Sequence, residues 1–172
     1  MMNSEPPAWK KLIFRFFFPS FNRKYLIRLC LITISAFTFF KYVCVPMHIN
    51  GKSMEPSYYD GTLNFCWRLK YIFSTPKRGD VVMVRLAGPK LMYLKRVVAL
   101  PGDTVEFKAG KLILNGNPVE EPYLVYPCDW NIPAVKVEDG YVYVVGDNRN
   151  VPQENHQHGR ASIKRIEGAP LW

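Results

Sequence analysis

Residues 91–98 read Leu-Met-Tyr-Leu-Lys-Arg-Val-Val, and this stretch decides the fold class predicted for the chain. Its apolar, aromatic and β-branched residues favour a strand. Successive side chains of a strand point to opposite faces, so Lys95 shares one face with Tyr93 and Val97, while Arg96 lies on the other. If the first face is the inner one, Lys95 is a lysine among apolar neighbours. The alternative is a solvated edge strand flanked by Lys95 and Arg96.

Similar short runs recur on both sides of this stretch, separated by turns rich in Gly, Pro and Asn. They are Leu63–Cys66, Val81–Arg85, Val105–Lys108, Lys111–Leu114 and Tyr141–Val145. From residue 58 on, no run of helical period exceeds two turns. The span from Glu120 to Gly140, rich in Pro and acids, is predicted to be a long excursion between strands. We therefore expect a mainly β domain built on an antiparallel sheet.

The N-terminal part contains an uncharged apolar run from Leu29 to Phe40. Extended to residues 26–45, the segment has 20 residues and reaches about 30 Å as a helix, enough to span a bilayer. We predict a basic cytoplasmic lead over 1–25, a transmembrane anchor over 26–45 and a β-rich domain over 46–172. A cleaved signal peptide is one alternative, although no Ala-x-Ala-like site follows the run. A buried helix of a soluble protein is another.

The net charge of +9 is concentrated near this segment. Residues 1–50 carry seven Lys or Arg against one acid, whereas residues 51–172 carry sixteen against thirteen. A membrane surface is therefore a better partner than a nucleic acid. Six of the basic residues precede the apolar run, so the N-terminus is expected in the cytoplasm and the β domain on the far side.

The four cysteines show neither CxxC spacing nor a histidine at zinc-finger distance. We expect no metal and no cofactor. A disulfide between Cys66 and Cys128 is compatible with the sequence, which does not decide it.

Chemistry is expected where the chain emerges from the apolar segment. Residues 50–57 read Asn-Gly-Lys-Ser-Met-Glu-Pro-Ser, a poor helix interior and a good exposed turn around Ser53. If Lys95 is buried, its ammonium form is disfavoured and its pKa falls. A neutral lysine amine can then take a proton from a serine hydroxyl.

The histidines offer two alternative readings. Ser53 with His156 or His158 and Asp147 would make a Ser–His–Asp triad. The pair His156-x-His158 with Glu154 would suggest a metal. A polar turn rich in histidine is more often solvated surface.

Four blocks in this order resemble the type I signal peptidases, which are membrane-anchored Ser–Lys endopeptidases. The blocks are residues 51–57 (Gly-Lys-Ser-Met-Glu-Pro-Ser), 77–82 (Lys-Arg-Gly-Asp-Val-Val), 95–103 (Lys-Arg-Val-Val-Ala-Leu-Pro-Gly-Asp) and 146–149 (Gly-Asp-Asn-Arg). Each alone is a weak signal, but four in family order behind an apolar segment are specific.

The resemblance implies that Ser53 is the nucleophile and Lys95 its general base, with the Ser53 N–H in the oxyanion hole. The supporting residues would be Arg96, Asp147, Asn148 and Arg149, and the substrate-binding residues Met54, Val81 and Val97. The chain departs from the family pattern in three places. Gly51 stands where many members carry an oxyanion-hole hydroxyl, Pro152 replaces a serine that orients the lysine, and Glu154 with His156 replaces an acid–arginine pair.

The expected function is cleavage of signal peptides from preproteins at the outer face of the bacterial cytoplasmic membrane. Expected partners are preprotein signal peptides and the lipid bilayer, with the translocation machinery as a further candidate, and no nucleic acid. Two alternatives stay open: a mitochondrial inner-membrane peptidase subunit, and an anchored binding module with a dead site. A soluble self-cleaving repressor is set aside, because such proteins carry a DNA-binding domain where this chain has an apolar segment.

Overall fold

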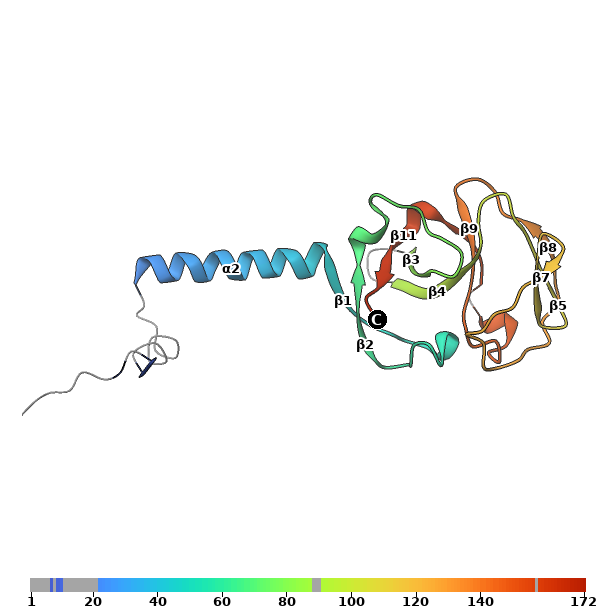
Figure 1. Cartoon of the computed structure of the whole chain (residues 1–172), viewed down its shortest axis with the longest axis horizontal. Coiled ribbons are helices and arrows are strands. Elements are labelled where there is room, and N and C mark those ends of the chain that lie inside the picture. Colours follow the sequence, from blue (N-terminus) through green and yellow to red (C-terminus); the bar gives the residue numbers. More distant parts are fainter. Residues whose placement is uncertain (1–6, 8, 11–21, 88–90, 157) are drawn as a thin grey trace, which may run out of the picture. The chain divides into compact units, whose positions relative to one another are not determined.

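The structure is a computed structural model that describes residues 7, 9–10, 22–87, 91–156 and 158–172 (Figure 1). The chain divides into two compact units, residues 1–41 and 42–172, which are taken separately below. Most of the predicted basic lead, residues 1–25, lies outside the described residues.

The N-terminal unit contains a single described long helix, α2 (Arg23–Tyr42). The Asn22 side chain accepts the Tyr25 N–H at 2.8 Å, which caps the helix start. None of its 20 residues is buried, and it is long and apolar enough to cross a membrane. The helix begins three residues before the predicted span 26–45, after the Asn22 cap, and it ends three residues before the end of that span, because Cys44 already starts a strand.

The C-terminal unit consists of two antiparallel sheets, which confirms the predicted fold class. The larger sheet has the strand order β1-β2-β11-β3-β4-β9-β10 and the smaller one β7-β6-β5-β8. The strands of the larger sheet are β1 (Cys44–His48), β2 (Leu63–Trp67), β3 (Val81–Ala87), β4 (Leu91–Ala99), β9 (Tyr141–Val145), β10 (Gly159–Ser162) and β11 (Ile166–Pro170). The strands of the smaller sheet are β5 (Thr104–Lys108), β6 (Lys111–Leu114), β7 (Asn117–Pro118) and β8 (Ile132–Lys136). Four short 3₁₀ helices lie between them, η1 (Lys52–Met54), η2 (Arg68–Tyr71), η3 (Gln153–Asn155) and η4 (Ile163–Arg165).

The six predicted strands are all present, and β4 pairs with β3 on one side and β9 on the other. The edge-strand reading of residues 91–98 is therefore wrong. Strands β1, β7, β8, β10 and β11 were not predicted, and β8 lies inside the expected excursion. Their sequences contain Pro or Gly and lack a β-branched alternation, so pairing with distant strands, not local propensity, makes them strands.

The core that matters for function lies beneath η1. Met54, Met83, Leu94, Cys66 and Ile49 form one buried apolar cluster. A second cluster joins the two sheets, and residues of β4, β5 and β9 contribute to it. Figure 1 shows where these strands lie. Through the first cluster, the turn after Asn50 packs on the centre of the larger sheet.

Candidate active site

Ser53 lies in η1, a single turn fixed by its neighbour. The Met54 side chain is 1% exposed and inserts into the cluster beneath, while the Tyr58 N–H donates to the Met54 carbonyl at 2.9 Å. At the start of the turn, Gly51 has φ +96° and its N–H donates to Asp60 at 2.8 Å. While the Met54 side chain is buried in this cluster, the Ser53 side chain stays partly exposed.

Lys95 reaches this serine from the interior strand β4. Its Nζ lies 2.5 Å from Ser53 Oγ, and the side chain is 2% exposed. Burial lowers the pKa of Lys95 from 10.5 to about 8, and the negative charge of Asp147 opposes that change. Ser53 is the one hydrogen-bond partner of Nζ within the part of the chain that the structure covers. The arrangement provides a hydroxyl beside an amine that loses its proton easily.

The Gly146–Arg149 block follows β9 and binds the backbone of the turn that contains Ser53. The Asn148 N–H donates to the Ser53 carbonyl at 3.0 Å, and the Asn148 side chain donates to the Lys52 carbonyl at 3.0 Å. Gly146 packs so closely that an added Cβ would lie 2.2 Å from the Ser53 carbonyl oxygen. The two hydrogen bonds and the close approach of Gly146 all involve the backbone of the turn, so this block positions Ser53.

Asp147 is fully buried and joins three of the four blocks. It accepts hydrogen bonds from Arg96 Nε at 2.8 Å and Nη2 at 2.6 Å, and from the Ser57 hydroxyl at 2.6 Å. Arg96 also donates to the Gly79 carbonyl at 2.7 Å. This carboxylate therefore links the turn to β4 directly, and Arg96 extends the link to the loop before β3. The role of Ser57 was not predicted, although it closes the first block.

Arg149 is buried as well, and its partner was missed from the sequence. Its Nε donates to the Gly146 carbonyl at 2.9 Å, and its other two nitrogens donate to Glu121 at 3.2 and 2.6 Å. Tyr123, two residues on, lies with its ring 4.1 Å from the guanidinium carbon of Arg96. No motif marks Glu121 or Tyr123, which belong to the excursion after Pro118.

The structure does not assemble the Ser–His–Asp triad. His156 Nε2 accepts the Gly146 N–H at 2.7 Å, and within the described residues Ser53 Oγ is hydrogen-bonded to Lys95 and not to a histidine. Burial, together with the nearby Lys95 charge, lowers the pKa of His156 to about 3, which keeps the ring neutral. His158 Nδ1 instead lies 3.2 Å from the Tyr143 hydroxyl. The Asp147 carboxylate accepts hydrogen bonds from Arg96 and not from a histidine.

Within the described residues, no group of three or more His, Cys, Asp or Glu could hold a metal ion, and Glu154 is exposed. All four cysteines are free thiols, so Cys66 and Cys128 do not form a disulfide here.

The predicted substrate-binding residues have different environments. Met54 and Val97 are buried at 1% and 0% exposure, so they support the site from within, and only Val81 retains a partly exposed side chain. A direct substrate contact therefore stays a prediction for Val81. The missing hydroxyl at Gly51 has a local explanation, because a backbone with φ +96° strains any residue other than glycine.

The chain is similar to known proteins over most of its length. The model of the family described as signal peptidase, peptidase S26, matches residues 22–170. The chain is 35% identical over 139 residues to the probable signal peptidase I-1 of Synechocystis sp., which covers 76% of this chain and 71% of that protein. It is 37% identical over 139 residues to signal peptidase I of Bacillus amyloliquefaciens, covering 74% of each. The crystal structure of a signal peptidase I from Enterococcus faecalis V583 has 25% sequence identity and a TM-score of 0.46, covering 56% of this chain and 97% of that one.

Proposed function

The chain belongs to the peptidase S26 family of signal peptidases, and on that premise we propose that Ser53 and Lys95 are its catalytic pair. The protein is a serine endopeptidase that cleaves signal peptides from preproteins. The observation that carries the residue assignment is the 2.5 Å separation between Lys95 Nζ and Ser53 Oγ, with the lysine buried.

Acylation begins with a neutral Lys95 amine. Ser53 Oγ attacks the scissile carbonyl carbon while its proton passes to Lys95 Nζ. The Ser53 N–H stabilises the negative oxygen of the tetrahedral intermediate. The Lys95 ammonium then protonates the leaving amine, the C–N bond breaks, and the signal peptide stays attached as an ester of Ser53.

Deacylation uses the same amine as base for a water molecule. Water attacks the ester carbonyl as Lys95 removes its proton, and Lys95 returns that proton to Ser53 Oγ as the acid is released. With a pKa of about 8 in place of 10.5, the neutral fraction of Lys95 at pH 7 is raised on the order of 300-fold. Burial therefore supplies the active form of the base.

We further propose that α2 anchors the enzyme in a bacterial cytoplasmic membrane, with residues 1–25 cytoplasmic and 46–172 on the outer face. The basic residues before α2 support this orientation. The exposed face of β2 supports closeness to lipid, because outward-facing Leu63 and Phe65 are apolar while inward-facing Asn64 is polar. Enzyme and embedded signal peptide would then share one interface, which raises their effective concentration. The translocation machinery of the same membrane is proposed as a further partner.

Cleavage of a model preprotein by the purified full-length chain in detergent tests the catalytic pair. Ser53→Ala and Lys95→Met are expected to fall to background, because each removes one member of the proton transfer. His156→Gln is expected to keep cleavage above background, since a glutamine oxygen can still accept the Gly146 N–H. Normal cleavage by Lys95→Met would refute the pair. A wild-type chain that cuts no preprotein would favour the binding-module alternative.

A reporter enzyme that is active only outside the cytoplasm, fused after Trp172 in bacterial cells, tests the orientation. Activity of this fusion is expected, and an inactive, stably expressed fusion would contradict the proposed orientation. A chain that enters isolated mitochondria and becomes active only there would favour the mitochondrial alternative.

A further inference from the structure

His156 directly follows the 3₁₀ turn η3 (Gln153–Asn155), and its side chain is buried. The turn begins after Pro152, and the His156 N–H donates to the Gln153 carbonyl at 3.2 Å. The His156 side chain is 2% exposed, whereas Glu154 in the same turn is exposed. The turn therefore directs one polar ring into the domain, in a region that contains Gly146.

The His156 ring makes a single hydrogen bond within the residues that the structure describes. Its Nε2 accepts the Gly146 N–H at 2.7 Å, and its Nδ1 has no hydrogen-bond partner among these residues. A backbone N–H can only donate, so Nε2 must present a lone pair, and the neutral ring carries its proton on Nδ1. The contact with Gly146 thus requires one particular tautomer of His156.

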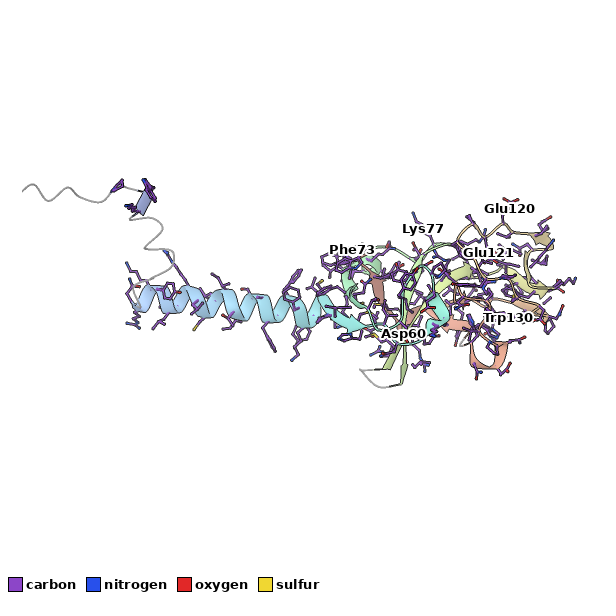
Figure 2. All side chains as sticks on the ribbon, turned by 90° about the horizontal axis from the view of Figure 1, so that it is seen from below. Asp60, Phe73, Lys77, Glu120, Glu121 and Trp130 are labelled. Carbon is purple, nitrogen blue, oxygen red and sulfur yellow. The ribbon has the colours of Figure 1, made fainter. Side chains whose placement is uncertain are left out.

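Trp130, two residues before β8, packs against this ring. Its side chain is 5% exposed and lies among the side chains of the β domain (Figure 2). The centroids of the Trp130 and His156 rings are 4.6 Å apart and the ring planes are inclined by 83°, which is edge-to-face packing. The guanidinium carbon of Arg149 lies 5.9 Å from the centroid of the same Trp130 ring. Trp130 therefore supports both His156 and Arg149.

These two supported residues bind both backbone polar groups of Gly146. His156 accepts the Gly146 N–H, and Arg149 Nε donates to the Gly146 carbonyl at 2.9 Å. Gly146 in turn lies against Ser53, because a Cβ added to Gly146 would lie 2.2 Å from the Ser53 carbonyl oxygen and 2.7 Å from His156 Nε2. The His156 ring, Gly146 and the Ser53 backbone are thus in close contact.

We propose that His156 is a positioning residue for the peptidase reaction, which holds Ser53 in place through Gly146. Without the His156 acceptor, the buried Gly146 N–H is left unpaired, and a shift of Gly146 toward another partner becomes favourable. Since Gly146 contacts the Ser53 carbonyl, such a shift also displaces the Ser53 backbone. Ser53 Oγ would then leave its position 2.5 Å from Lys95 Nζ. The inference rests on Ser53 being the nucleophile.

The test compares His156→Gln with His156→Met in preprotein cleavage by the full-length chain in detergent. The two new side chains are similar in length, but the glutamine oxygen can accept the Gly146 N–H, whereas the methionine thioether is only a weak acceptor. The kcat of the folded His156→Met variant is expected to fall about 10- to 100-fold, because a displaced reacting group is costly. His156→Gln is expected to keep most of kcat. Thermal unfolding in detergent gives the folded fraction of each sample.

His158→Met is the matched control. His158 also packs against Trp130, with ring centroids 5.4 Å apart, but its Nδ1 lies 3.2 Å from the Tyr143 hydroxyl. Its kcat is expected to equal that of wild type. A merely structural role of His156 predicts lower unfolding temperatures with unchanged kcat in the folded fraction. Equal kcat in the two folded His156 variants overturns the inference, and so does a comparable loss of kcat in His158→Met.

A folding failure of His156→Met is covered by His156→Asn. Its amide is the same as that of glutamine, but the side chain is one methylene shorter and does not reach the Gly146 N–H. The same loss of kcat is expected, and a wild-type kcat overturns the inference. Normal cleavage by Ser53→Ala would instead refute the nucleophile assignment.

Nitrogen NMR of the wild-type chain with labelled histidine tests the contact without a substitution. The His156 signals, identified by their absence from the His156→Gln spectrum, are expected at pH 7 to be those of the tautomer protonated on Nδ1. A ring protonated on Nε2, or on both nitrogens, could not accept the Gly146 N–H, and either result overturns the inference.

Discussion

Gly146→Ala changes one hydrogen to a methyl group directly behind Ser53, the proposed nucleophile. The added Cβ would lie 2.2 Å from the Ser53 carbonyl oxygen and 2.7 Å from His156 Nε2, where contacts below 3.0 Å are not found. Relief requires a displacement of roughly 1 Å, and the Ser53 backbone has to take much of it. The Asn148 N–H would then lose its 3.0 Å bond to that carbonyl, and Oγ would leave its place 2.5 Å from Lys95.

A misplacement of about 1 Å in a reacting group can cost about 100-fold in rate. We therefore expect kcat/KM of Gly146→Ala to fall by about 100-fold, with the loss mainly in kcat, because the change moves the reacting atoms. The assay is preprotein cleavage at pH 9, where Lys95 is mostly neutral. A thermal unfolding curve in detergent shows how much of the sample is folded.

Gly168→Ala is the matched control. Its Cβ would also meet a backbone carbonyl, that of Trp67, at 2.4 Å, but in β11 and outside the catalytic pair. Neither glycine has a positive φ, so the two substitutions differ in location and not in backbone strain. Gly168→Ala is expected to lower the unfolding temperature while the folded fraction keeps kcat. Wild-type kcat in Gly146→Ala would refute the claim that Gly146 positions Ser53.

Three further outcomes follow from the buried groups of the site. The kcat/KM of wild type is expected to rise about tenfold per pH unit and to level off above a half-maximal pH near 8, which is the pKa of Lys95. A half-maximal pH near 6.5 would instead indicate a histidine base. Because folding lowers the pKa of Lys95, the folded chain binds fewer protons than the unfolded chain between pH 8 and 10.5, and stability rises with pH across that window. Lys95→Met is therefore expected to be more stable than wild type at pH 7 by up to roughly 3 kcal/mol, and a lower unfolding temperature would contradict the cost of burying this lysine. Ser57→Ala removes a 2.6 Å bond to the buried Asp147 carboxylate and is expected to cost about 1 to 3 kcal/mol in unfolding free energy, whereas an unchanged unfolding temperature would show that Arg96 alone satisfies this carboxylate.

The alternating run at residues 91–98 was enough to predict a strand and the neighbours that share a face with Lys95, whereas the central position of this strand became clear only from its pairing with β3 and β9. Strands whose own side chains favour extended structure, such as Tyr141–Val145, were predicted at their observed bounds. Strand β8 was not predicted from the sequence, because it contains Pro133 and forms a strand only through its pairing with β5. The helix end was misplaced for a related reason, since Cys44 pairs with Trp67, 23 positions away in the sequence.

The mainly β class, the apolar helix and the order of the four blocks are evident from the amino-acid sequence alone, because these features depend on local pattern and on residue identity. The burial of Lys95 against Ser53, the contact of His156 with Gly146 and the pairing of Glu121 with Arg149 are evident only in the folded chain. Burial and charge pairing depend on which distant residues exclude water from a side chain. That exclusion exists only once the sheets have packed, and it raises the neutral fraction of the Lys95 amine, which the proposed activation of Ser53 requires.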